Sequence, residues 1–135
     1  LIVNEGELLV VANHDGNIAS CLDRIDIPCV IVTLGERGCC ARTNDLVIAQ
    51  PGFRIDALDT TAAGDTFCGV LVAALSKGDT MQSALTRANA AGALACTTLG
   101  AQSSIPEEAK IDSFLQDCPA PNINQVDALK SSCGF

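Results

Sequence analysis

The chain has 135 residues, which fits one domain or a piece of a larger one, and 48% hydrophobic residues are enough for a sizeable core. Aromatic residues make up only 3%, so this core must consist mainly of Leu, Ile, Val and Ala, as in α/β layers. The net charge of −8 argues against nucleic acid or an anionic membrane surface as the main partner.

The eight cysteines favour free thiols in a reducing cytosol. Several lie inside apolar runs, where Cys behaves as a small buried hydrophobe, and no Cys-x-x-Cys pair is present. His14 is the single histidine, which disfavours a zinc site. We find no signal peptide and no apolar run of about 18 residues, so no membrane span is expected. The chain starts directly on an apolar strand-like segment and resembles the later part of a longer protein.

The first elements place polar side chains at the end of a strand. Residues 1–3 are typical of a buried strand, and Asn4 and Glu7 follow before an apolar helical segment over residues 8–12. The carboxyl edge of an open α/β sheet is where ligands bind, and Glu7 is suited to hold Mg²⁺ through water. The alternative is a capping box of Asn4 and Glu7, which the pattern alone favours.

A second strand and a glycine-containing loop come next. After a turn at residues 14–16 and a short helix over residues 18–25, the β-branched run at residues 29–32 predicts a buried strand. The following loop, residues 33–38, has two glycines that could bring backbone close to a phosphate or ribose, although a hairpin turn is the ordinary interpretation. Residues 39–42 and 46–49 predict paired antiparallel strands around residues 43–45.

The central stretch combines a small-residue turn with a long apolar helix. A strand end is expected at residues 54–58, a turn at Ala62, Ala63 and Gly64, and a helix over residues 66–75. Such a turn leaves backbone N–H groups at the positive end of the helix, where an anion is held well. Asp65 beside this anion site suits a base that takes a proton from an attacking hydroxyl. The alternative is that Asp65 caps the helix and residues 62–64 form a plain tight turn.

The last third predicts two helices and a tail. An Ala-rich helix is expected from Met81 to about Cys96, and Asn89 on it needs a polar partner, which a base, a ribose or another helix could supply. Residues 97–104 predict a polar loop, and a further helix runs from Glu107 to about Leu115. The tail, residues 117–135, has two prolines and mixed polarity, and we expect it to be poorly ordered or loosely docked.

Four segments together resemble one family, the ribokinase-like sugar kinases, also called the phosphofructokinase B family. They are Asp59-Thr-Thr-Ala-Ala-Gly-Asp-Thr-Phe67, Asn4-x-x-Glu7, Thr33-Leu-Gly-Glu-Arg-Gly38 and Gly100-Ala-Gln-Ser-Ser-Ile-Pro106. The resemblance covers residues 1 to about 115 and corresponds to the C-terminal portion of a family member. It implies an α/β fold with a three-layer Rossmann-like sheet and helices on both faces, incomplete at its N-terminal side. Residues 1–116 would form the nucleotide-binding and catalytic part, and residues 117–135 the tail.

The resemblance also implies roles for individual residues. Asp65 corresponds to the catalytic base and contacts the sugar, and the N–H groups of Ala62, Ala63, Gly64 and Asp65 correspond to the anion hole. ATP binding is implied for Asn4, Thr33, Leu34, Gly35, Glu36, Arg37, Gly38, Gly64, Asp65 and Asn89. Glu7 would organise Mg²⁺ through water. Potassium ligands are implied at Asp59, Thr61, Ala95, Thr98, Gly100 and Ser104, partly through backbone carbonyls.

The expected activity is ATP-dependent phosphorylation of D-ribose to D-ribose 5-phosphate, because within the family the sequence most resembles the ribokinases. The alternatives are a fructokinase or nucleoside kinase, or a truncated chain that binds nucleotide without turnover. The family's N-terminal half, which supplies most sugar contacts and a lid, has no counterpart here, so the isolated chain should be inactive. The implied partners are ATP and a small sugar in the cytoplasm, with Mg²⁺ and K⁺ as cofactors and a homodimer as the expected state of the parent.

Overall fold

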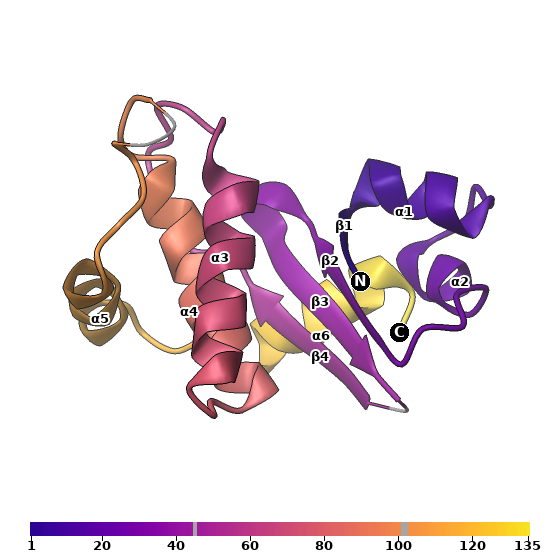
Figure 1. Ribbon diagram of the computed structural model, residues 1–135. Coiled ribbons are helices and arrows are strands. Elements are labelled where there is room, and N and C mark those ends of the chain that lie inside the picture. The colour runs from indigo at the N-terminus through magenta and orange to yellow at the C-terminus, as the bar shows by residue number, and fades with distance from the viewer. Residues whose placement is uncertain (45, 101–102) are drawn as a thin grey trace. The chain divides into compact units, whose positions relative to one another are not determined.

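A computed structural model describes residues 1–44, 46–100 and 103–135, and the chain divides into two compact units (Figure 1). Unit 1 comprises Leu1–Pro51 together with Pro121–Phe135, and unit 2 comprises Gly52–Ala120. Within the described ranges, no helix has the length and apolar character needed to cross a membrane.

Unit 1 is built on a four-stranded mixed sheet. The strands are β1 (Ile2–Asn4), β2 (Cys29–Thr33), β3 (Gly38–Thr43) and β4 (Leu46–Pro51), in that spatial order. β1 pairs with β2 in parallel, whereas β2–β3 and β3–β4 are antiparallel. The predicted antiparallel pairing of residues 39–42 with residues 46–49 is therefore confirmed. Of the turn expected at residues 43–45, Asp45 lies outside the described residues.

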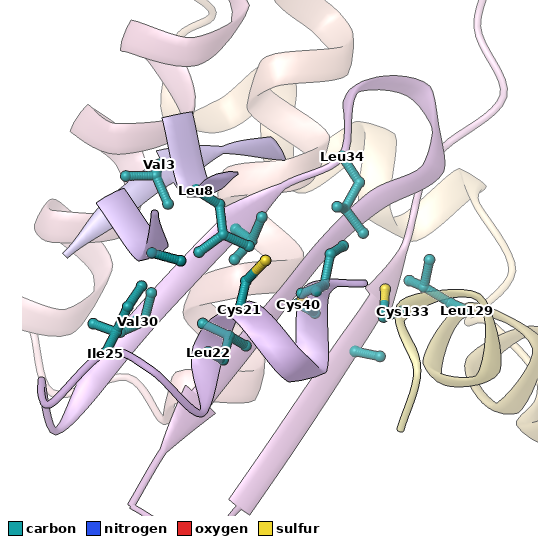
Figure 2. Close-up of a cluster of buried hydrophobic side chains, with 14 residues drawn as sticks. Val3, Leu8, Cys21, Leu22, Ile25, Val30, Leu34, Cys40, Leu129 and Cys133 are labelled. Atoms are coloured by element: carbon teal, nitrogen blue, oxygen red, sulfur yellow. The ribbon is translucent and has the colours of Figure 1, made fainter. Parts of the chain in front are cut away.

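Three helices of unit 1 share one hydrophobic core with the sheet. They are α1 (Glu5–Ala12), α2 (Ile18–Leu22) and α6 (Ile123–Cys133). Alternate residues of β2, Val30 and Val32, are fully buried in this core, as the period of two in a strand requires. Figure 2 shows Leu8 of α1, Leu22 of α2 and other apolar side chains gathered against the strands. Burial of these aliphatic and thiol side chains is the main driving force for folding of unit 1.

The tail differs from its expected form, because residues 123–133 form helix α6. Its ends are well defined: Asn122 and Gln125 make a capping box, and Gly134 ends the helix with a φ of 91°. Leu129 and Cys133 are buried in the unit 1 core (Figure 2). Val126 is partly buried and packs against the same core. A one-sided apolar stripe at helical spacing therefore docks a segment that was expected to be poorly ordered or only loosely docked.

Unit 2 consists of α3 (Ala63–Ser76), α4 (Met81–Ala95), α5 (Glu108–Asp117) and the segments that connect them. Thr80 caps α4 through its side chain, and Gly78 follows the end of α3 with a φ of 93°. α5 packs on α4 through Ala90, Ala91 and Ile111. Beside them, Phe53 of the segment before α3 meets Phe114 of α5 edge to face, with ring centroids 5.2 Å apart. The predicted helices of this region are all present.

Residues 54–58 do not form the strand that was expected there. The amides of Leu58 and Asp59 both donate to the carbonyl of Cys96, at distances of 2.7 and 3.1 Å. These donors are therefore used by the end of α4 and not by a strand ladder. The short helix expected over residues 18–25 also ends earlier, at Leu22.

The described residues thus form a mixed α/β structure with a four-stranded mixed sheet and six α-helices. The finer expectation of a three-layer sheet with helices on both faces, incomplete at its N-terminal side, stays a prediction.

Candidate functional site

The loop at residues 33–38 is a tight turn between β2 and β3 in unit 1. Its middle is a short 3₁₀ helix, Gly35–Arg37, and the Leu34 amide donates to the Gly38 carbonyl at 2.8 Å. Gly35 and Gly38 have φ values of 60° and 109°, which L side chains rarely adopt. The two glycines are therefore required by the turn itself, as in the hairpin interpretation, and nucleotide binding by this loop stays a prediction.

Asn4 and Glu7 form the capping box that was the alternative to a ligand role. The Asn4 side chain accepts from the Glu7 amide at 2.9 Å, and Glu7 Oε2 accepts from the Asn4 amide at 2.8 Å. The second carboxylate oxygen of Glu7 has no such bond to the cap. This oxygen can accept a hydrogen bond from a water bound to Mg²⁺, so the capping role and the proposed magnesium role are compatible.

An ion pair joins these two segments of unit 1. The Arg37 guanidinium pairs with the Glu5 carboxylate, and this hydrogen bond raises the pKa of Arg37. The pair was not predicted from the sequence. The only signal was the opposite charge of Glu5 and Arg37 in two segments that each follow a predicted strand. The pair brings Asn4–Glu7 and the Thr33–Gly38 loop together in unit 1.

In unit 2, helix α3 begins without a side-chain cap. Ala62 is the N-cap residue, Ala63 donates to the Thr60 carbonyl at 3.2 Å, and Thr66 donates to the Ala62 carbonyl at 3.0 Å. Among the described residues, the amides of Ala62, Gly64 and Asp65 have no hydrogen-bond partner. Three of the four proposed anion-hole amides are therefore open at the positive end of a helix of 14 residues, whereas that of Ala63 is engaged.

Asp65 lies in the first turn of α3, three residues after the N-cap, and not at the capping position. It is exposed, and its carboxylate makes no hydrogen bond or ion pair within the described part of the chain. The simple capping alternative therefore does not describe this residue. An exposed carboxylate beside open amides is free to accept a proton from a bound hydroxyl.

The Asp59 carboxylate organises the loop that precedes α3. Its Oδ1 accepts from the Thr61 amide at 2.9 Å and the Thr61 hydroxyl at 2.5 Å, and its Oδ2 accepts from the Gly100 amide at 3.2 Å. These donors lower the pKa of Asp59, with the Thr61 hydroxyl as the largest cause. Gly100 has a φ of 92°, which favours glycine at this point.

Two neighbouring turns of unit 2 carry the other proposed potassium ligands. Thr98 donates its amide to the Ala95 carbonyl at 3.4 Å, and Ser104 donates its amide to the Gly100 carbonyl at 3.2 Å. The described residues contain no group of three or more His, Cys, Asp or Glu side chains able to hold a metal. A cation here would depend on one carboxylate and on carbonyl oxygens. That donor set fits a large, weakly hydrated monovalent ion.

Asn89 is buried on α4 and already makes a polar interaction in the structure. Its proposed contact with adenine stays a prediction. The structure therefore brings the candidate residues together in two groups, each inside one unit. Unit 1 holds Asn4, Glu7 and residues 33–38, and unit 2 holds Asp59, Thr61, residues 62–65, Asn89, Ala95, Thr98, Gly100 and Ser104.

Comparison with known proteins places this geometry in a family. The model of the pfkB family carbohydrate kinases matches residues 1–108. A putative fructokinase-8 of Arabidopsis thaliana is 35% identical over 109 residues, which cover 76% of this chain and 52% of the relative. A ribokinase of Haemophilus influenzae is 40% identical over 90 residues, which cover 67% of this chain and 29% of the relative.

Solved structures are similar over most of the chain. A putative ribokinase II of E. coli in complex with ATP and Mg²⁺ has 30% identity and a TM-score of 0.79, over 87% of this chain and 39% of that chain. A double-mutant fructokinase of Vibrio cholerae with bound fructose, ADP and potassium has 34% identity and a TM-score of 0.79, over 84% and 39%. The chain thus spans about half the length of its curated relatives, or less.

Proposed function

The chain belongs to the pfkB family of carbohydrate kinases, and we propose that it is the nucleotide-binding and catalytic portion of a longer kinase that phosphorylates D-ribose with ATP. The observation that carries this proposal is the start of α3, where the exposed carboxylate of Asp65 stands among open backbone amides. This chain joined to the N-terminal portion that its relatives have is called the complete protein.

In the proposed reaction, Asp65 takes the proton of the 5-hydroxyl of ribose as this oxygen attacks the γ-phosphorus of ATP and ADP leaves. The open amides of Ala62, Gly64 and Asp65 stabilise the charge on the phosphoryl group in transit. Positioning supplies most of the catalysis in such a transfer. Residues 33–38 and Asn89 are proposed to hold the nucleotide, with Asn4 near its phosphates.

The residues present fit two ions. Mg²⁺, held through water by Glu7, would neutralise phosphate charge, and K⁺ among Asp59, Thr61 and the carbonyls of residues 95–104 would fix the loop before α3. Relatives whose structures contain ATP with Mg²⁺, or ADP with potassium, support this assignment. We propose a reducing cytosol as the compartment, and a homodimer as the state of the complete protein.

Fructose is the second candidate substrate, because relatives named fructokinase match this chain at an identity similar to that of relatives named ribokinase. The residues expected to discriminate between sugars lie outside this chain. The choice is therefore tested by measuring kcat/KM of the complete protein with ribose, fructose and a nucleoside.

The test of the proposed function is Asp65→Asn in the complete protein. Removal of the base should lower kcat at least about 10²-fold, while ATP binding measured by calorimetry persists. Asp127→Asn is the matched control, because Asp127 is an exposed acid on helix α6. Turnover of Asp65→Asn close to that of the control would reject the base assignment. Absence of sugar-dependent ADP formation by the unmodified protein would reject the kinase itself.

A further inference from the structure

Helix α4 packs against the start of helix α3 at a glycine. Gly92 is buried on α4, and a Cβ atom placed there would lie 3.3 Å from the carbonyl oxygen of Ala63 and 3.8 Å from Cβ of Phe67. A separation of 3.3 Å is tighter than nine in ten Cβ contacts, so a side chain would require the first turn of α3 to move by a few tenths of an ångström. The absence of a side chain at position 92 therefore lets the first turn of α3 lie close to α4.

The same part of α4 also holds the loop before α3. The carbonyl of Cys96, four residues after Gly92, accepts from the amides of Leu58 and Asp59. Residues 58–63 are thus hydrogen-bonded to Cys96 at one end and packed closely against Gly92 at the other. Cys96 and Gly92 both lie at the C-terminal end of α4. The direction of the open amides of Gly64 and Asp65 therefore depends on the spacing between α4 and α3.

We propose that Gly92 is a positioning residue for phosphoryl transfer: its lack of a side chain lets α4 seat the first turn of α3 so that the amides of Gly64 and Asp65 point at the transferring group. This inference rests on the proposed function. Gly92 touches neither sugar nor nucleotide in this role, and it acts through the backbone of Ala63.

A role of Gly92 in stability and a role in positioning predict different results for Gly92→Ala. Inside a helix Ala is favoured over Gly, because Gly loses more backbone freedom on folding. A purely local contribution to the helix therefore predicts an equal or higher melting temperature and unchanged kinetics. Positioning predicts a loss of rate in a folded protein, since small displacements of catalytic groups are costly.

The experiment compares Gly92→Ala with Gly69→Ala in the complete protein. Gly69 is an exposed residue of α3, and a Cβ atom there meets nothing within 4 Å. We expect kcat of Gly92→Ala to fall about tenfold, with KM for ATP within about threefold of the unmodified value. Gly69→Ala should leave both parameters unchanged. Amide chemical shifts of Ala62, Gly64 and Asp65 should move in Gly92→Ala and stay in place in Gly69→Ala.

Two results would overturn the inference. One is a folded Gly92→Ala with kcat within twofold of the unmodified protein. The other is unfolding of Gly92→Ala at 25 °C, which would assign Gly92 to the stability of the helix pair. If the unmodified protein phosphorylates no sugar, the proposed function fails, and the amide shifts still decide whether Gly92 sets the position of the α3 start.

Discussion

Thr66 is a buried residue with an unusual hydrogen-bonding state. It directly follows Asp65 on α3 and is only 4% exposed, yet its Oγ1 has no hydrogen-bond partner among the described residues. A buried hydroxyl without a partner costs about 1–3 kcal/mol relative to a bonded one. The first turn of α3 therefore combines open amides, an exposed acid and an unpaired hydroxyl. The unpaired hydroxyl lowers the free energy of unfolding at the place where the proposed chemistry occurs.

Replacement of Thr66 by Val should leave the free energy of unfolding of this chain unchanged or raise it by about 1 kcal/mol, because Val removes the unpaired hydroxyl and keeps the branched shape. The measurement is urea denaturation followed by circular dichroism. Thr66→Ser is the control, which keeps the hydroxyl and loses a methyl group, and it should lower the free energy of unfolding. A larger loss for Val than for Ser would show that the hydroxyl is bonded in solution.

At single residues, sequence reasoning worked where the cause is local. The capping box of Asn4 and Glu7 was predictable because its residues are three apart and because side chains at the N-cap and N3 positions of a helix meet. The pairing of Glu5 with Arg37 and the contact of Gly92 with Ala63 were not predictable in this way. Each joins residues about 30 positions apart, so each depends on a fold that local pattern does not specify.

Among the elements, α6 shows how a mixed pattern can hide a helix. Two prolines before it and several polar residues indicated a poorly ordered or loosely docked tail, yet a capping box, a C-terminal glycine and an apolar stripe were all present in the sequence. The stripe consists of Val126, Leu129 and Cys133, at helical spacing. The strand expected at residues 54–58 failed for a different reason, because the amide of its last residue, Leu58, donates to the Cys96 carbonyl at the end of α4.

Docking of α6 can be tested by shortening one of its side chains that is buried in the unit 1 core. Leu129→Ala should lower the free energy of unfolding by about 3 kcal/mol, because Leu129 is 7% exposed and packed in the unit 1 core (Figure 2). Ile123→Ala on the same helix is the matched control, since Ile123 is 68% exposed, and its effect should stay within about 0.5 kcal/mol. Denaturant unfolding measures both. Equal effects of the two substitutions would contradict the docked position of α6.

At the scale of the whole molecule, the candidate residues divide between two units, and the chain covers less than half of the solved relatives. Family membership was predictable because the segment from Asp59 to Phe67 is long and specific. The sugar substrate was not predictable, since some relatives are named ribokinase and others, at similar sequence identity, are named fructokinase. A phosphoryl transfer needs acceptor and donor held together, and this chain offers candidate residues mainly for the donor.

The isolated 135-residue chain should therefore bind ATP but show no sugar-dependent ATP consumption. Calorimetry should detect nucleotide binding in the presence of Mg²⁺ and K⁺. A coupled assay of ADP formation, run with ribose and with fructose, should give the same rate as the chain carrying Asp65→Asn, which sets the background. The complete protein in the same assay is the positive control. A ribose-dependent rate of the isolated chain above this background would show that the residues from Leu1 to Phe135 suffice to hold the acceptor sugar, and that positioning does not need the N-terminal portion found in relatives.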